Sequence, residues 1–204
     1  RTARLAQITA GGKLPPRYPR QGLLGGSSRG AVRRGAGAGG TVPSASNAPA
    51  GKVTASLLIS NARTACDEDL LAREGVTFCV NVTRQQPFPG LQQVRGIRVP
   101  VFDDPAEDLY RYFEQCSDAI EEAVRGGGKC LVYCKNGRSR SAAICTAYLM
   151  RHRKLPLKDA FETVKAARPV AEPNAGFWSQ LQRYEEDLKI SKQPDLLNKG
   201  LNSL

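Results

Sequence analysis

Residues 129–151 constrain the fold of this chain more than any other segment, because they combine a strand, a polar loop and a helix; they read KCLVYCKNGRSRSAAICTAYLMR. The apolar residues 130–133 predict a strand, and the helix is expected to begin at Arg140 or Ser141. Cys134 is therefore expected at the mouth of a helix N-terminus, where backbone N–H groups point outward and the helix dipole is positive. The segment predicts an anion site, which suits both a thiolate and a phosphate group.

The side chains of this loop favour nucleophilic chemistry on a bound phosphate. Arg140 stands six residues after Cys134, and its guanidinium fork can hold two phosphate oxygens at once. Loop amides, a helix N-terminus and an arginine together favour the thiolate of Cys134, which is the nucleophilic form. Ser141 can donate a hydrogen bond to the sulfur and make it a better leaving group. Gly137 lets the loop amides converge; the expected phosphate-binding residues are Lys135, Asn136, Gly137, Arg138, Ser139 and Arg140.

The N-terminal part of the chain differs in composition from the rest. Residues 1–50 hold ten of the twenty glycines, five of the thirteen prolines and eight of the thirty Lys and Arg residues, but neither Asp nor Glu. No hydrophobic period survives there, so the segment cannot bury enough apolar area to offset its ordering entropy. We therefore expect a disordered, basic, Gly- and Pro-rich tail over residues 1–51, one folded domain over 52–190 and a flexible end over 191–204.

Two other interpretations of the tail compete with disorder. An Arg-containing segment without acidic residues is also typical of an organelle-targeting presequence or of a weak nucleic-acid-binding arm. Outside residues 1–50, 22 basic residues stand against 19 acidic ones. The folded part is thus nearly neutral, and we expect no nucleic-acid partner.

The cysteines and the histidine argue against metal and cofactor chemistry. The six cysteines lie mostly in apolar segments and lack the paired spacing of a zinc site. His152 is the single histidine, so neither a Cys–His hydrolase dyad nor a histidine-rich metal site is expected, and we predict no metal and no cofactor. Scattered cysteines fit a reducing compartment, which favours a cytoplasmic protein that can also be nuclear. No apolar run approaches the length of a membrane span.

Strands and helices alternate through the rest of the chain. This order, followed by a run of helices, predicts an α/β fold with a small central sheet of about four or five strands flanked by helices. Gly75 is expected to stop one helix, and Asn174 to cap the start of another. The expected strands are residues 53–60, 76–83, 97–102 and 130–133; besides the helix after the loop, the expected helices are 65–74, 106–124 and two with apolar faces at 157–164 and 177–188.

The loop sequence Cys134-Lys-Asn-Gly-Arg-Ser-Arg140-Ser141 matches the Cys-x5-Arg-Ser/Thr signature of cysteine-dependent phosphatases, and residues 52–190 resemble the small atypical dual-specificity protein phosphatases. The resemblance implies a protein-tyrosine-phosphatase-like fold and a phosphocysteine intermediate. It also implies a shallow cleft that accepts phosphotyrosine and phosphoserine or phosphothreonine in protein substrates. Shorter motifs support it: Ala62-Arg63-Thr64, Gly75-Val76-Thr77, Val80-Asn81-Val82-Thr83, Arg168-Pro169 and Pro173-Asn174-Ala175-Gly176-Phe177.

The resemblance further implies a general acid, which the family carries as an Asp on a loop upstream of the cysteine. Asp103 and Asp104 are the two candidates here. Counting back from Leu109, which starts the next apolar helix face, favours Asp103. Asp104 is then free to cap that helix. The same Asp would protonate the leaving oxygen first and activate water in the second step.

One position departs from the family pattern. Where the family usually has a histidine that helps to keep the thiolate, this chain has Tyr133. A neutral phenol offers no positive charge, so we expect low activity. Lys135, Asn136 and Arg138 replace small or apolar loop residues. The two cations either compensate for Tyr133, favour another substrate such as a phosphoinositide or an RNA 5′-phosphate, or form a solvated surface.

Two functional hypotheses follow from these residues. The first is an active phosphatase in which Cys134, Arg140, Asp103 and Ser141 act on phosphorylated protein substrates. The second is a weakly active or inactive phosphate-binding adaptor on the same fold, motivated by Tyr133. Nucleophile, arginine, serine and acid are all present, so the enzyme is the preferred hypothesis.

Overall fold

The computed structural model describes residues 6–8 and 48–192. The rest of the predicted N-terminal tail and residues 193–204 lie outside the described residues. The elements are, in chain order, β1 (Ala6–Ile8), β2 (Gly51–Lys52), β3 (Leu57–Asn61), α1 (Ala62–Ala65), α2 (Glu68–Glu74), β4 (Val76–Asn81), β5 (Arg95–Arg98), α3 (Tyr110–Arg125), β6 (Lys129–Cys134), α4 (Arg140–His152), α5 (Leu157–Ala167) and α6 (Ala175–Lys192).

The strands of the described chain form one sheet of six, in the order β1-β5-β4-β6-β3-β2. The inner strands β5, β4, β6 and β3 are parallel, whereas β1 and β2 pair antiparallel at the two edges. The sheet confirms the predicted α/β class. Residues 6–8 and 51, which the sequence analysis places in the N-terminal tail, belong to the edge strands β1 and β2.

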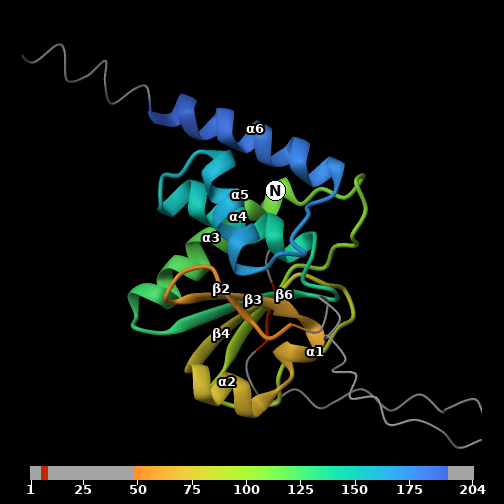
Figure 1. The fold of residues 1–204 in the computed structure, drawn as a ribbon, viewed down its shortest axis with the longest axis vertical. Coiled ribbons are helices and arrows are strands. Elements are labelled where there is room, and N and C mark those ends of the chain that lie inside the picture. Colours follow the sequence, from red (N-terminus) through yellow and green to blue (C-terminus); the bar gives the residue numbers. More distant parts are fainter. Residues whose placement is uncertain (1–5, 9–47, 193–204) are drawn as a thin grey trace, which may run out of the picture.

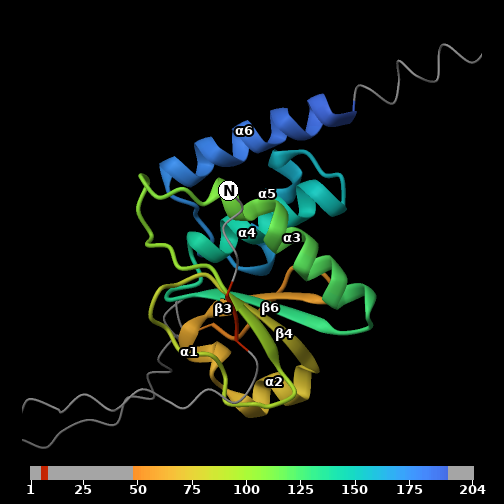
Figure 2. The same ribbon diagram turned by 180° about the vertical axis from the view of Figure 1, so that it is seen from behind.

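Helices cover both faces of the sheet. Helices α3, α4, α5 and α6 lie on one face, and α1 and α2 lie on the other (Figures 1 and 2). Successive residues of β6 point to opposite faces: Val132 and Cys134 belong to the hydrophobic cluster under the larger helical layer, and Leu131 and Tyr133 to the cluster under the smaller one. Cys134 and Tyr133 therefore lie on different sides of the sheet.

The carboxyl ends of the parallel strands meet at one edge of the sheet. Asn61, the last residue of β3, is opposite Cys134 in the register, and Asn81, the last residue of β4, is opposite Tyr133. In parallel α/β sheets, ligands bind outside these ends. The sheet therefore places the predicted loop where such folds hold their ligands.

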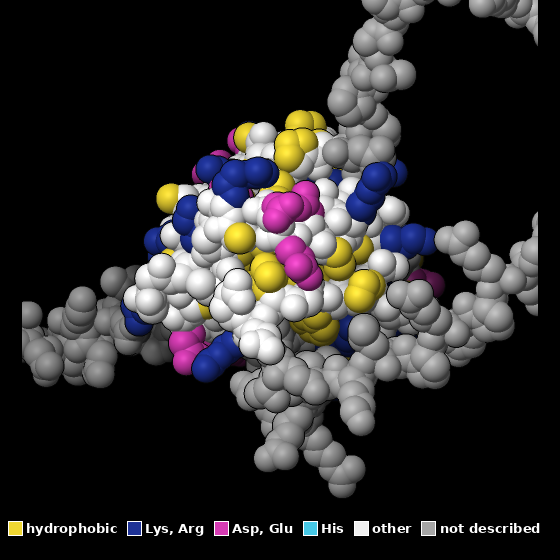
Figure 3. Space-filling model, turned by 90° about the horizontal axis from the view of Figure 1, so that it is seen from below, with side chains coloured by type: hydrophobic (Ala, Val, Ile, Leu, Met, Phe, Trp, Pro, Cys, Tyr) yellow, Lys and Arg dark blue, Asp and Glu magenta, His cyan; other side chains and the backbone are white. Residues whose placement is uncertain are grey.

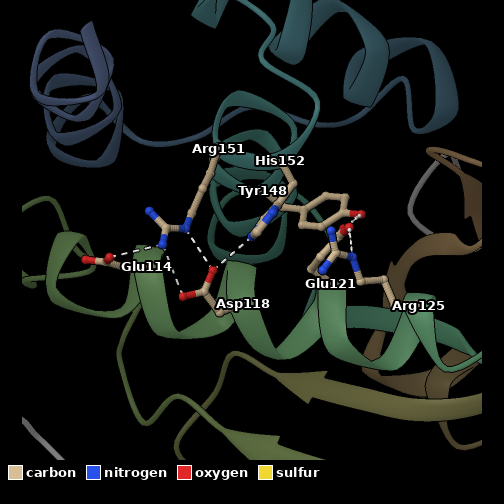
Figure 4. Close-up of polar contacts among 7 residues, drawn as sticks. All are labelled: Glu114, Asp118, Glu121, Arg125, Tyr148, Arg151 and His152. Atoms are coloured by element: carbon tan, nitrogen blue, oxygen red, sulfur yellow. Dashed lines mark hydrogen bonds and ion pairs between the residues drawn. The ribbon is translucent and has the colours of Figure 1, made fainter. Parts of the chain in front are cut away.

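Polar contacts join the long helix α3 to the buried helix α4 (Figure 4). Asp118 accepts hydrogen bonds from Arg151 Nε at 2.8 Å and Nη2 at 3.2 Å, and its Oδ1 lies 2.9 Å from Nε2 of His152. The hydroxyl of Tyr148 donates to Glu121 at 2.8 Å. These contacts hold α4 at its C-terminal end, opposite the end that carries the phosphate loop.

Two predicted helix ends agree with the structure. Gly75 closes α2 in the left-handed conformation with φ of 74°, which glycine adopts at little cost. The side-chain oxygen of Asn174 accepts the N–H of Phe177 at 2.9 Å, as a capping residue does.

The prediction around residues 95–110 is wrong in detail. The strand expected over 97–102 is β5, Arg95–Arg98, and the helix expected from 106 begins at Tyr110. Pro100 cannot donate to a strand neighbour, so the chain leaves the sheet and runs as a loop to Leu109. Val99 and Val101 are nevertheless buried, which explains why their apolar pattern resembles a strand.

In the part of the chain that the structure describes, no helix combines the length and apolarity required to cross a bilayer.

Candidate active site

The loop between β6 and α4, where the phosphate site is predicted, bends at a glycine. It runs from Cys134, at the end of β6, to Arg140, the first residue of α4. Gly137 has φ of 62°, and a Cβ atom on it would lie 2.6 Å from the carbonyl oxygen of Ser60 and 2.7 Å from Nε of Arg168. Glycine is thus required at this position, both by its backbone conformation and by the space around it.

The sulfur of Cys134 lies beside the hydroxyl of Ser141. The two atoms are 3.1 Å apart, and both residues are buried, Cys134 with 2% of its surface exposed. Ser141 is in the first turn of α4, so the thiol faces the N-terminal end of that helix. The predicted pair is therefore brought together, in a position that favours negative charge on the sulfur.

Arg140 is only partly satisfied by protein partners. Its Nη1 donates to the carbonyl oxygen of Val101 at 3.1 Å. Its Nε is buried, and no hydrogen-bond partner for it exists among the described residues. Unpaired buried donors are rare in proteins, and a guanidinium N–H left free at the start of α4 is suited to an oxyanion.

Asp103 is tied to the phosphate loop through Asn174. The side-chain amide of Asn174 donates to Asp103 Oδ1 at 2.9 Å, and the backbone N–H of Asn174 donates to Ser139 Oγ at 2.9 Å. By contrast, Asp104 Oδ1 accepts the N–H of Ala106 at 2.8 Å, which is a contact inside its own turn. Of the two aspartates, Asp103 is the one that the structure joins to the loop.

Arg168 supports the loop from beneath, a contact that the sequence analysis missed. It is 1% exposed and donates from Nε to the Gly137 carbonyl at 2.7 Å and from Nη2 to the Asn136 carbonyl at 3.1 Å. Burial lowers its pKa from the ordinary arginine value. The only signal in the sequence was the Arg168-Pro169 motif, and a motif alone does not say which segment the guanidinium holds.

The two cations of the loop have different surroundings. Arg138 forms an exposed ion pair with Glu172, whose backbone N–H also donates to the Arg138 carbonyl at 2.7 Å. The hydrogen bond from Arg138 lowers the pKa of the Glu172 carboxyl. The Arg138 charge is thus paired, whereas no ion pair of Lys135 exists among the described residues. The positive charge expected at the mouth is therefore smaller than the sequence suggested.

Tyr133 is buried on the opposite face of the sheet from the thiol. Its hydroxyl donates to the carbonyl oxygen of Pro87 at 2.8 Å. Burial raises the pKa of the phenol well above its ordinary value, so the group stays neutral at physiological pH. Tyr133 thus ties β6 to the loop after β4 and adds no charge next to Cys134.

Comparison with known proteins identifies the family. Residues 57–187 match the family model described as dual specificity phosphatase, catalytic domain. The chain is 63% identical to human dual specificity phosphatase 28 over 156 residues, which cover 74% of this chain and 89% of the relative. It is 39% identical to human dual specificity protein phosphatase 14 over 137 residues, covering 67% and 69% of the two chains.

Solved structures agree with this result. A crystal structure of human dual specificity phosphatase 28 superposes with a TM-score of 0.68 at 64% identity, covering 70% of this chain and 96% of that one. A mouse putative dual specificity phosphatase complexed with zinc tungstate gives a TM-score of 0.70 at 58% identity, with 76% and 95% covered. The chain thus belongs to the dual specificity phosphatase family and is a protein phosphatase.

Proposed function

We propose that this chain hydrolyses phosphotyrosine and phosphoserine or phosphothreonine in proteins, with Cys134 as nucleophile. The observation that carries the proposal is the 3.1 Å contact between Cys134 Sγ and Ser141 Oγ at the start of α4. A thiol in this place meets a helix N-terminus, converging loop amides and a serine donor at once. The buried, unpaired Nε of Arg140 adds a donor for phosphate oxygens.

In the first step the thiolate of Cys134 attacks phosphorus, a sulfur–phosphorus bond forms and the ester oxygen–phosphorus bond breaks. Asp103 gives its proton to the leaving oxygen, which departs as an alcohol or a phenol. The amides of residues 135–140 and the guanidinium of Arg140 hold the three non-bridging oxygens. The product is a phosphocysteine with the phosphate still in the loop.

In the second step a water attacks the phosphocysteine. Asp103, now ionised, takes a proton from that water, and the sulfur–phosphorus bond breaks to release inorganic phosphate. Ser141 donates its hydroxyl to the departing sulfur, which stabilises the thiolate as it forms. The contact of Asp103 with Asn174, 2.9 Å long, supports this double role because it holds the carboxylate near the loop for both proton transfers.

We further propose that this chain hydrolyses its substrates at a low rate. Tyr133 is neutral, so it cannot supply the positive charge that a histidine at this position would supply. This observation also favours a second candidate, a phosphate-binding adaptor with little or no turnover. A third candidate, hydrolysis of a non-protein phosphate such as a phosphoinositide, is supported by the unpaired charge of Lys135.

Steady-state hydrolysis of an aryl phosphate by wild type, Cys134→Ser and Asp103→Ala separates these candidates. The enzyme proposal predicts turnover by wild type and none by Cys134→Ser. Equal rates for wild type and Cys134→Ser would contradict the enzyme proposal and leave the phosphate-binding adaptor as the remaining candidate. Phosphopeptides and soluble phosphoinositides compared at equal concentration then decide between protein and non-protein substrates, and Asp103→Ala is suited to trapping a phosphoprotein partner because it still binds phosphate.

We also propose a cytoplasmic protein that reaches the nucleus. The six cysteines of the described residues are all free thiols, and free thiols persist in reducing compartments. Fractionation of cells that express a tagged full-length chain tests this, and recovery in a secretory or mitochondrial fraction would contradict it.

A further inference from the structure

A cavity that the proposed mechanism does not use opens beside the phosphate loop. Its volume is about 480 Å³, and its wall comes from the start of α1, from the loop after β4 and from the first two residues after the nucleophile. The polar residues that line it are Asn61, Arg63, Gln86, Lys135 and Asn136. The cavity thus shares two residues with the phosphate loop.

The wall of this cavity is fixed directly against the nucleophile. Asn61 and Cys134 are partners in the register of β3 and β6, and neighbouring strands lie about 4.8 Å apart. The N–H of Ala62 donates to the carbonyl oxygen of Lys135 at 3.3 Å. Arg63, the next residue, therefore stands on a backbone that is bonded to the phosphate loop itself.

Both cations of the cavity are exposed and lack an ion pair or a side-chain hydrogen bond within residues 48–192. Arg138 differs, because Glu172 neutralises it. Glu68 lies near Cys66, which lines the cavity, and burial and then this carboxylate raise the pKa of the Cys66 thiol. Asp67 lies beyond Arg63 in a neighbouring cavity of about 390 Å³. Its carboxylate accepts the N–H of Leu70 at 3.1 Å as the cap of α2. The cavity beside the nucleophile is left with two unpaired positive charges.

This charge is local. Figure 3 looks at the face of the molecule that carries α1 and α2, where Lys and Arg side chains stand apart from one another toward the rim and acidic side chains lie near the centre. A broad basic surface, such as a nucleic acid or a membrane requires, is not present on the part of this face that the structure describes. Two cations at one cavity instead suit a single small anionic group.

We propose that Arg63 and Lys135 form a second anion subsite, which binds an acidic or phosphorylated side chain close to the phosphoester in a peptide substrate. The inference rests on the proposed function, since the first phosphate must occupy the loop at Cys134. Arginine binds carboxylate and phosphate through a paired fork. The wall of the cavity is bonded directly to the loop at Lys135, so we expect the subsite to bind a residue that is a near neighbour of the phosphorylated one in the peptide.

The test compares three phosphotyrosine peptides that differ at the flanking position. One carries alanine there, one aspartate, and one a non-hydrolysable phosphonate analogue of phosphoserine; the last two distinguish carboxylate from phosphate as the recognised group. A small aryl phosphate, which cannot reach the cavity, serves as the reference substrate. We expect wild type to have a kcat/KM about fivefold higher for an anionic flank than for alanine, and this preference to fall as NaCl is added.

The decisive variant is Arg63→Ala, and Arg73→Ala is its control. Arg73 is an exposed arginine of α2 outside both cavities. Arg73→Ala therefore removes the same charge from the protein as Arg63→Ala does. Arg63→Ala should reduce the preference for an anionic flank to about one- to twofold and leave hydrolysis of the aryl phosphate unchanged. Arg73→Ala should keep the preference. Adding Lys135→Met to Arg63→Ala should remove what preference remains.

Three results would overturn the subsite while leaving the phosphatase intact. They are equal kcat/KM for all three peptides, equal loss of preference in Arg63→Ala and Arg73→Ala, and an effect of Arg63→Ala on a soluble inositol phosphate instead of on the peptides. Failure of the proposed function gives a different result, since wild type would then hydrolyse the aryl phosphate no faster than Cys134→Ser.

Discussion

The side-chain amide of Asn174 donates a hydrogen bond of 2.9 Å to the carboxylate of Asp103. The same residue donates its backbone N–H to Ser139 in the phosphate loop, also at 2.9 Å, and caps α6 through its side-chain oxygen. Asn174 thus joins the loop that carries Asp103, the loop between β6 and α4, and the start of α6. The position of Asp103, the proposed general acid, relative to the loop between β6 and α4 therefore depends on the segment before α6.

Asn174→Ser separates these roles, because serine caps a helix as well as asparagine does but has no amide to offer Asp103. We expect kcat to fall about tenfold for substrates with a poor leaving group, since proton transfer then comes from a less ordered acid. The melting temperature should change little. The measurement is kcat on a phosphoserine peptide and on an activated aryl phosphate.

The activated ester is the internal control for Asn174→Ser. Its leaving group departs without a proton, so its hydrolysis should be nearly unaffected. An equal loss on both substrates would show that Asn174 acts by holding the phosphate loop and not by placing Asp103.

Asp103→Asn and Asp104→Asn form a matched pair, since each removes one carboxylate from adjacent positions on the same loop. If Asp103 is the general acid, its loss should lower kcat on a phosphoserine peptide by about a hundredfold and flatten the pH–rate profile. Asp104 caps its own turn, so Asp104→Asn should stay within about twofold of wild type. The reverse order of effects would transfer the role to Asp104.

The local parts of this structure could be predicted from the sequence. The strand before Cys134, the helix from Arg140, the stop at Gly75 and the cap at Asn174 all depend on residues within a few positions of each other, and their patterns are strong. The family signature supplied the loop geometry. The contact of Cys134 with Ser141 spans seven residues and was predicted from the order of strand, loop and helix.

The long-range parts could not be predicted in the same way. Arg168 and Gly137 meet across 31 positions, and no periodicity links them. The ion pair of Arg138 with Glu172 changes the charge at the loop, although each residue alone resembles solvated surface. Pro100 ended a strand whose apolar residues continue beyond it. For Arg168 and Glu172 the missing information is which distant segment folds back, which tertiary packing decides, whereas Pro100 is a local signal that the apolar pattern outweighed.

Tyr133→His is expected to raise activity. An imidazole can carry a positive charge one residue before Cys134, where the buried phenol stays neutral. We expect kcat/KM on an aryl phosphate at pH 6 to rise about three- to tenfold, and half-maximal rate to be reached at a lower pH. The measurement is a pH–rate profile of both proteins.

Tyr133→Phe is the control for this gain. It removes the hydrogen bond to Pro87, which should cost about 1 kcal/mol of stability, but it adds no charge. A gain in rate as large as that of Tyr133→His would mean that releasing the loop at Pro87, and not charge, limits the enzyme.

The contact of α3 with α4 should make stability depend on pH in the acid range. Hydrogen bonds from Arg151 lower the pKa of Asp118 below the ordinary 3.8. A carboxyl whose folded-state pKa is depressed stabilises the fold above its unfolded value and loses this contribution as pH falls through the folded one. Asp118→Asn should therefore lower the free energy of unfolding at pH 7 and have almost no effect near pH 2.

The expected size of this effect is small, about 0.5 kcal/mol, because the Asp118 side chain is 50% exposed and solvent screens the pair. Thermal melts of wild type and Asp118→Asn at pH 7 and pH 2, each at low and high NaCl, provide the measurement. The difference should shrink with salt. A difference that persists at pH 2 would assign the contribution of Asp118 to packing.

Arg168→Lys tests whether the loop is held in shape from beneath. Lysine keeps the charge but cannot donate to the carbonyls of Gly137 and Asn136 in the fixed geometry of a guanidinium. One buried carbonyl is then left without its donor, at a cost of about 1–3 kcal/mol. The loop amides should converge less well, so inorganic phosphate should inhibit about five- to tenfold more weakly, with a lower melting temperature.

Stability and phosphate binding must be separated in this case. Arg151→Lys is a suitable reference, because it weakens a hydrogen-bonded arginine contact at the opposite end of α4 and leaves the loop alone. It should lower the melting temperature without changing inhibition by phosphate. If both variants weaken phosphate binding in proportion to their loss of stability, Arg168 contributes through the fold in general. A change in inhibition confined to Arg168→Lys would show that the guanidinium sets the curvature of the loop.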